Sequence, residues 1–140
     1  MKNVQQNNRV VLDTNIIVSA LIFGGIPRKV TDLVVDKKFR PVMSEELMTE
    51  LRRVITEKFP LARHELEIYE KLMRRYAIWV VLGNRRVIAS RDPDDDKFIE
   101  TAVAGDCKYI ISGDKDLLTL ETYGGIKILS ASDFLISIEQ

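Results

Sequence analysis

Short apolar segments alternate along this chain with longer segments in which apolar residues recur every three or four positions. A short run rich in Val and Ile is typical of a buried strand, and the wider spacing is typical of an amphipathic helix. The pattern predicts strands over residues 9–12, 39–44, 77–82, 108–112 and 126–130. It predicts helices over residues 15–21, 28–38, 45–59, 64–77, 96–105 and 132–140, with a turn and a short helix within 113–125.

The alternation of strands and helices predicts the fold class. Consecutive β-α-β units favour parallel strands with helices on both faces, so we expect an α/β fold. Its form is a three-layer α/β/α arrangement around a mostly parallel sheet of four or five strands. The chain length suits one domain, residues 1–140, with 1–8 as a flexible N-terminus. Ser44 is the expected N-cap of one helix, and Gly105 the expected C-cap of another.

Charge and cysteine content bear on the environment and the partners. The 21 basic and 21 acidic side chains give a net charge near zero, so binding to nucleic acid would need a local patch or a bound cation. Cys107 is the only cysteine, which excludes an intrachain disulfide. Neither a signal-peptide pattern nor an apolar run of about 18 residues is present. We therefore expect a cytoplasmic protein that does not engage a membrane.

Carboxylates occupy positions where buried strands end. Asp13 interrupts the apolar run "RVVLDTNIIVSAL", and Asp114 and Asp116 follow the strand predicted over 108–112. Sites in open α/β sheets form outside the carboxyl ends of the strands, where the strand order reverses. If strands 9–12 and 108–112 are neighbours there, Asp13 and Asp114 converge. A simpler alternative is that Asp13 only caps the helix that follows it.

Two further acids occupy helical positions expected at the same edge. Asp96 begins the helix predicted over 96–105, and Glu50 lies on the apolar side of the helix over 45–59. One pair of carboxylates about 4 Å apart repels by about 4 kcal/mol at an effective dielectric constant near 20. A cluster of four would therefore require protonation or a bound cation. Oxygen ligands without His or Cys favour Mg²⁺ or Mn²⁺.

A cation held by such acids could hold a phosphate, polarise it and activate a water for in-line attack. Thr14, Asn15 and Ser112 are close in sequence to the acids and could orient the metal's waters or the scissile phosphate. Capping of a helix or turn is an equally open alternative for each of them. The lone histidine, His64, lies in a polar helix start far along the chain and is not expected to be a ligand.

Four segments, taken together, resemble the PIN domain family. In chain order they are "VVLDTNIIVSAL", "SEELMTELRRVI", "DPDDDKFIETAVAG" and "YIISGDKDLL", and their order and spacing match the family over roughly residues 9–135. The chain is most similar to the branch regarded as toxins of toxin–antitoxin modules. The resemblance implies a doubly wound, mostly parallel sheet and a Mg²⁺- or Mn²⁺-dependent endoribonuclease that hydrolyses single-stranded RNA. It also implies an antitoxin protein as partner and a homodimer as the assembly.

The resemblance further implies roles for individual residues. The family's four catalytic and metal-binding acids match Asp13, Glu50, Asp96 and Asp114. Asp116 resembles an additional acid seen in many members. The small polar residues that accompany these acids match Thr14, Asn15 and Ser112.

Two of these assignments have alternatives in the sequence. The segment "DPDDDK" offers adjacent acids, so Asp95 is the alternative to Asp96 as the third acid. Asp92 and Asp94 flank a proline, where Asp is commonly structural. Glu46 is the alternative to Glu50, because both lie on one helix face a turn apart.

Two other functions compete with the nuclease interpretation. A catalytically inactive PIN-fold domain that binds RNA or a partner would keep the fold without the reaction. A phosphatase-like phosphotransferase would use Asp13 as nucleophile, but such enzymes usually carry a second Asp two residues later, where Asn15 stands. Apolar helical faces in "VTDLVV" and "YEKLM" are the surfaces that could serve a homodimer or an antitoxin.

Overall fold

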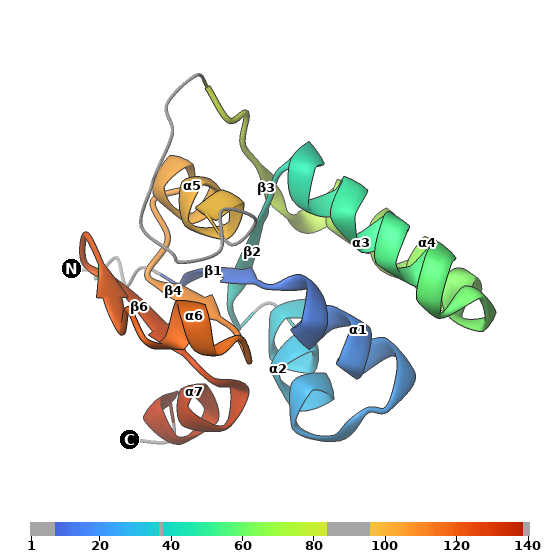
Figure 1. Cartoon of the computed structure of the whole chain (residues 1–140), viewed down its shortest axis with the longest axis horizontal. Coiled ribbons are helices and arrows are strands. Elements are labelled where there is room, and N and C mark those ends of the chain that lie inside the picture. Colours follow the sequence, from blue (N-terminus) through green and yellow to red (C-terminus); the bar gives the residue numbers. More distant parts are fainter. Residues whose placement is uncertain (1–7, 37, 84–95, 139–140) are drawn as a thin grey trace.

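A computed structural model describes residues 8–36, 38–83 and 96–138. Within these residues, six strands form one sheet in the order β3-β2-β1-β4-β6-β5 (Figure 1). The strands are β1 (Arg9–Leu12), β2 (Arg40–Met43), β3 (Ile78–Trp79), β4 (Tyr109–Ile111), β5 (Thr122–Tyr123) and β6 (Ile126–Leu129). Every neighbouring pair is parallel except β5 and β6. The expected α/β class with a mostly parallel sheet is therefore confirmed.

The helices pack on both sides of this sheet. They are α1 (Thr14–Ile22), α2 (Gly25–Val35), α3 (Glu45–Lys58), α4 (Arg63–Tyr76), α5 (Asp96–Ala104), α6 (Lys115–Leu118) and α7 (Ala131–Ile138), with a 3-10 turn at Pro60–Ala62. In Figure 1, α5 lies above the central strands, and α1, α2 and α7 lie below them. The two longest helices, α3 and α4, pack together as a hairpin beside β2. Helices thus cover both faces, as the alternation of elements predicted.

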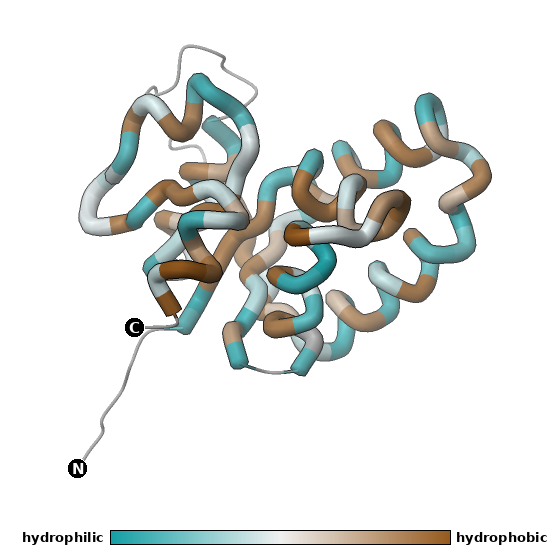
Figure 2. The backbone as a smooth tube through the Cα atoms, turned by 90° about the horizontal axis from the view of Figure 1, so that it is seen from below, coloured by the Kyte–Doolittle hydropathy of each residue, from teal (hydrophilic) through white to brown (hydrophobic). Residues whose placement is uncertain are grey.

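Burial follows the hydrophobic pattern of the sequence. All three residues of β4 are buried, and only the first residue of β1 is exposed. Phe134, Met48 and Ile99 are fully buried and come from three different helices that close on the sheet. In Figure 2, brown and teal alternate along the helices, as expected of segments with one face toward the core. None of the helices in the described ranges is long and apolar enough to cross a bilayer.

The sheet differs from the sequence expectation at its two edges. The strand expected over 77–82 is reduced to β3, two residues long, and β5 was not expected. Strands β5 and β6 form a hairpin through Gly124 and Gly125, whose φ angles are 53° and 86°. Two consecutive positive φ angles are typical of the two-residue turns that join antiparallel strands. The described sheet consequently has six strands, against the four or five expected.

Gly105 follows the last residue of α5, as expected of a C-cap, but its importance lies in packing. The left-handed conformation belongs instead to Asp106, with φ 52°. A Cβ atom on Gly105 would lie 2.4 Å from Cγ1 of Val42 in β2. Such a distance is far below van der Waals contact, so glycine lets the end of α5 approach the buried sheet.

The strand order reverses at β1, which positions the site. From β1 the chain passes to β2 and β3 on one side, whereas β4, β6 and β5 lie on the other. Leu12 of β1 is in register with Ile111 of β4. The residues that follow these two strands therefore emerge side by side at the carboxyl edge of the sheet. Of the N-terminus expected to be flexible, residues 1–7 lie outside the described ranges, so that expectation stays a prediction, as does the single-domain organisation.

Candidate acidic site at the carboxyl edge of the sheet

Asp13 is the first residue beyond β1 and is almost completely buried, with 3% of its surface exposed. Its backbone N–H donates to the carbonyl of Ile111 at 3.0 Å, which extends the pairing of β1 with β4. One carboxylate oxygen accepts a hydrogen bond from the N–H of Ile16 at 3.0 Å, so Asp13 does cap α1. The other oxygen accepts a hydrogen bond from the hydroxyl of Ser112, which follows β4. Capping therefore uses only part of this carboxylate.

The turn after β4 brings a second carboxylate to Asp13. The Ser112 hydroxyl oxygen accepts a hydrogen bond from the N–H of Asp114 at 2.9 Å, and Ser112 is fully buried. Asp114 in turn caps α6 and accepts from the N–H of Asp116 at 2.8 Å. The negative charge of Asp114 acts on Asp13 and disfavours its ionisation. Asp13 and Asp114 thus converge through Ser112, as the sequence predicted for neighbouring strands.

Burial raises the pKa of Asp13 above its ordinary value. Loss of water is the largest cause, and the neighbouring charge of Asp114 acts in the same direction. Hydrogen bonds from Ser112 and from the backbone N–H groups of Ile16 and Gly113 act in the opposite direction. The chain therefore holds a buried carboxylate whose negative charge is only partly compensated by hydrogen bonds.

Glu50 lies on α3 and is held by two groups. Thr14, which follows Asp13, donates its hydroxyl to one carboxylate oxygen of Glu50. The ammonium group of Lys97 lies 2.5 Å from the other oxygen, and the Glu50 side chain is 14% exposed. The sequence alternative, Glu46, is exposed on the first turn of the same helix. Of the two acids, Glu50 is the one linked to the segment that carries Asp13.

Asp96 begins α5 and is buried, with 7% of its surface exposed. It immediately precedes Lys97, which joins the start of α5 to Glu50. The alternative third acid, Asp95, lies outside the described residues, as do Asp92 and Asp94. The side chain of Asp116 is half-buried beside Asp114. The contact of Lys97 with Glu50 places the start of α5 close to α3.

The polar residues expected to assist the acids fall into two groups. Ser112 and Thr14 are both buried and hydrogen-bonded to acids of the predicted set. Asn15 is exposed on the first turn of α1, and His64 is exposed at the start of α4. The sequence analysis missed Lys97, although its position directly after Asp96 was a usable signal.

The acids form two linked pairs in the described parts of the chain. Asp13 lies with Asp114, and Glu50 lies with Lys97, the two pairs being connected through the adjacent residues Asp13 and Thr14. Within the described ranges, no group of three or more His, Cys, Asp or Glu side chains is placed so that it could hold a metal ion as it stands. Convergence of all four acids on one ion therefore stays a prediction.

The donor chemistry of the site suits a hard divalent cation. The side chains recorded as acting on Asp13, those of Ser112 and Asp114, offer oxygen, as do those of Thr14 and Glu50 next to them. A cation beside Asp13 and Asp114 would offset both the cost of burying Asp13 and the repulsion between the two acids. Mg²⁺ and Mn²⁺ prefer such oxygen ligands.

Comparisons with known proteins bear on the family and the fold. The family model described as "PIN domain" matches residues 9–116. An uncharacterized protein of Methanocaldococcus jannaschii, MJ1680, is 34% identical over 116 residues, which cover 80% of this chain and 74% of that protein. The fold is similar to that of VapBC2 from Rickettsia felis, solved bound to a DNA fragment from its promoter. For that structure the TM-score is 0.56 at 14% identity, covering 86% of this chain and 96% of the other. The chain belongs to the PIN domain family.

Proposed function

We propose that this chain is a Mg²⁺- or Mn²⁺-dependent endoribonuclease that hydrolyses phosphodiester bonds of single-stranded RNA. The observation that carries the proposal is the buried carboxylate of Asp13 beside Asp114 at the point where the strand order reverses. Ligand sites of open α/β sheets lie at such points. Membership of a family whose members are generally nucleases adds support.

Asp13 and Asp114 are the residues proposed to hold the cation, with Asp96 as the third ligand. When bound, such a cation supplies Lewis-acid polarisation of a phosphoryl oxygen and a more acidic bound water. Ser112 positions both acids, because its hydroxyl donates to Asp13 and accepts from the backbone of Asp114. This double contact holds the carboxylate of Asp13 close to the backbone of Asp114.

Glu50, on α3, completes the proposed set. Thr14 holds one of its oxygens, and Lys97 neutralises its charge in the chain without metal. Because Lys97 is 24% exposed, its ammonium group can also reach an anion arriving from solvent. We assign Lys97 a positioning role, in which it leaves Glu50 for a substrate phosphate as the acidic site gains a cation.

The direct test is cleavage of a 5′-labelled single-stranded RNA by the full chain in Mn²⁺, with EDTA as the metal-free control. Asp13→Asn and Glu50→Gln should each lose activity. Glu46→Gln is the matched control and should cleave normally, because Glu46 is exposed on the same helix. Equal cleavage by wild type and Asp13→Asn would contradict the assignment and indicate a contaminating nuclease.

The same preparations separate the competing functions. An inactive PIN-fold binding domain would retain RNA affinity, show weak metal binding and give no cleavage by wild type. An Asp-based phosphotransferase would form a phosphoaspartate at Asp13, detectable as a mass increase of the intact chain. The nuclease proposal requires cleavage without that covalent species.

We further propose that the chain is the toxin of a toxin–antitoxin module. In this proposal two copies of the chain form a homodimer, and a separate antitoxin protein binds to it. Much of the apolar faces suggested by the sequence is core, because Val30 and Val34, like Tyr69 and Met73, are buried. Large exposed apolar side chains occur elsewhere and include Phe23, Ile26, Leu61 and Ile68.

Light scattering of the purified chain tests the dimer, since a monomer at micromolar concentration would contradict it. Growth arrest on expression, relieved by co-expressing the adjacent gene, tests the toxin assignment, and normal growth would contradict it.

A further inference from the structure

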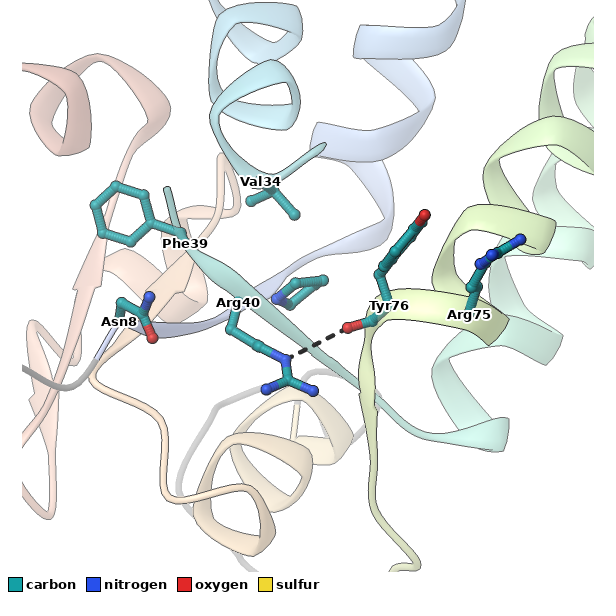
Figure 3. Close-up of a pocket in the computed structure, with 7 residues that line it drawn as sticks. Asn8, Val34, Phe39, Arg40, Arg75 and Tyr76 are labelled. Atoms are coloured by element: carbon teal, nitrogen blue, oxygen red, sulfur yellow. Dashed lines mark hydrogen bonds between the residues drawn. The ribbon is translucent and has the colours of Figure 1, made fainter. Parts of the chain in front are cut away.

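A second concave site lies at the opposite, amino edge of the sheet. Its cavity has a volume of about 270 Å³ and is lined by Asn8, Val34, Phe39, Arg40, Pro41, Arg75 and Tyr76 (Figure 3). Asn8 directly precedes β1, Arg40 begins β2, and Tyr76 ends α4. The four residues of β1 separate this edge from Asp13, which corresponds to about 13 Å of extended chain. The cavity is therefore distinct from the acidic site.

The charged side chains among the described lining residues of this cavity are both positive. Arg40 and Arg75 both line it, and no Asp or Glu occurs among its described lining residues. In the described chain, neither arginine forms an ion pair, whereas the adjacent Arg74 contacts both Glu45 and Glu70. Arg40 uses its Nε–H to bind the carbonyl of Tyr76 at 3.4 Å, and Figure 3 shows its terminal nitrogens directed away from that contact. The rest of the Arg40 guanidinium group therefore points away from Tyr76.

The cavity is also lined by an exposed aromatic ring and by buried apolar residues. Tyr76 is 40% exposed, and the guanidinium carbon of Arg75 lies 5.7 Å from its ring centre. Val34 and Pro41 are buried, and Phe39 packs edge-on against the fully buried ring of Phe134 at 4.9 Å between centroids. An exposed ring beside guanidinium groups can stack a planar base while the arginines bind an oxyanion.

We propose that this cavity binds a nucleoside monophosphate unit, either as a free nucleotide or as one residue of a single-stranded RNA. Arg75, whose guanidinium lies beside the Tyr76 ring, binds its phosphate, Arg40 adds positive charge to the cavity, and Tyr76 stacks on its base. A guanidinium matches the geometry of phosphate oxygens, and stacking on an aromatic ring tolerates any base. The volume is close to the lower end of the range of roughly 300–1,000 Å³ typical of small-molecule pockets, which suits one nucleotide.

The binding experiment uses 5′-AMP and the full chain in EDTA, so that cleavage at the acidic site plays no part. Wild type should bind AMP at up to millimolar concentration, as followed by amide chemical shifts or calorimetry. The double variant Arg40→Gln/Arg75→Gln should bind at least about tenfold more weakly, because hydrogen bonds to charged groups are lost. Arg63→Gln is the matched control, since Arg63 is exposed at the far end of α4.

Ligand variation tests the two halves of the proposed site. Tyr76→Leu should weaken AMP several-fold and leave ribose 5-phosphate unchanged, because only AMP has a base to stack. The proposal is overturned if wild type does not bind AMP, or if the double variant loses less than tenfold. It is also overturned if an acidic peptide competes as well as AMP, which would identify a peptide site.

The alternative in which the occupant is a residue of a single-stranded RNA rests on the proposed nuclease function, so it is tested in a separate experiment. If the occupant is a residue of the substrate strand, Arg75→Gln raises KM for a long single-stranded RNA and leaves kcat unchanged. If KM is also unchanged while AMP binding falls, the ligand is the free nucleotide. Failure of RNA cleavage altogether would contradict the nuclease proposal but not the AMP result in EDTA.

Discussion

The two ends of the same parallel strands present opposite chemistry. At the carboxyl edge, Asp13 is buried and its pKa is raised, with Asp114 close by. At the amino edge, Arg40 and Arg75 are exposed and line a cavity without carboxylates among the residues described. Burial of the Asp13 carboxylate lowers the stability of the fold, whereas the exposed arginines lower it little, because water solvates them. A group retained at such a cost is the better candidate for chemistry, and the exposed groups suit reversible binding.

Helix α5 connects the two edges. Its first turn carries Asp96 and Lys97, and Lys97 contacts Glu50 of the acidic site. Beyond its other end, the carbonyl of Gly105 accepts a hydrogen bond from the guanidinium of Arg9 at 3.1 Å, at the start of β1. Changes to α5 should therefore disturb the acidic edge even when they are made at the amino edge.

The largest contrast should appear in RNA cleavage. Asp13→Asn should reduce the rate by at least about a hundredfold, since it removes a proposed charged ligand of the cation. Arg75→Gln, at the opposite edge, should change kcat by less than about twofold. Single-turnover cleavage of one RNA by both variants makes the comparison. Equal losses would mean that the two edges are not functionally distinct.

Packing at the end of α5 gives the next largest effect. Gly105→Ala should lower the free energy of unfolding by about 1–3 kcal/mol, because the new methyl group overlaps the buried side chain of Val42. Gly83→Ala is the control, because nothing lies within 4 Å of a Cβ at that position. Urea denaturation of both variants measures the difference. Equal stabilities would show that α5 does not approach β2 as closely as described.

The cost of burying Asp13 should be visible in stability without metal. Its pKa is raised by burial from an ordinary 3.8, so between that pH and its folded pKa the folded state holds the extra proton. Stability therefore falls as pH rises through this window, and the loss persists at neutral pH. In EDTA at pH 7, Asp13→Asn should melt a few degrees above wild type, because Asn can still cap α1. The gain should vanish near pH 3.8, and a lower Tm at pH 7 would contradict this electrostatic account.

The smallest effect concerns the counter-ion of Glu50. Lys97→Met should strengthen Mn²⁺ binding several-fold, because it removes a positive charge 2.5 Å from a proposed metal-binding carboxylate. Lys71→Met, on the exposed side of α4, should leave the affinity unchanged. Calorimetric titration with Mn²⁺ compares them. A weaker affinity in Lys97→Met would mean that Lys97 supports the metal site instead of competing with it.

The hydrophobic pattern was sufficient to predict the central part of the fold. Buried strands such as β1 and β4 produce unbroken apolar runs, and the register of Leu12 with Ile111 follows from their pairing at the centre of the sheet. The edges were harder to predict, because β3 and β5 have only two residues each and depend on their neighbours. The Gly124–Gly125 pair is a hairpin signal that the sequence analysis did not use, and the structure shows positive φ angles at both glycines.

Strand topology decides which of the predicted site residues lie close together, and their roles stay predictions. Asp13 and Asp114 lie close together because they follow neighbouring parallel strands, and this proximity does not depend on how the side chains pack. The position of Lys97 directly after Asp96 marked it as a residue near the predicted site, but its contact with Glu50 depends on how α5 and α3 pack. The arginine cavity likewise combines the start of β2 with the end of α4, whose residues Arg40 and Tyr76 are 36 positions apart, so spacing in the sequence could not reveal it.

Diffraction from a crystal soaked in Mn²⁺ tests the central claim most directly. The account predicts an anomalous peak within coordinating distance of the carboxylates of Asp13 and Asp114, with Asp96 as a further ligand and Lys97 displaced from Glu50. The same soak of Asp13→Asn should show no peak there. A peak elsewhere, or an unchanged site with Lys97 still on Glu50 and no bound ion, would contradict the proposal that these acids hold a catalytic cation.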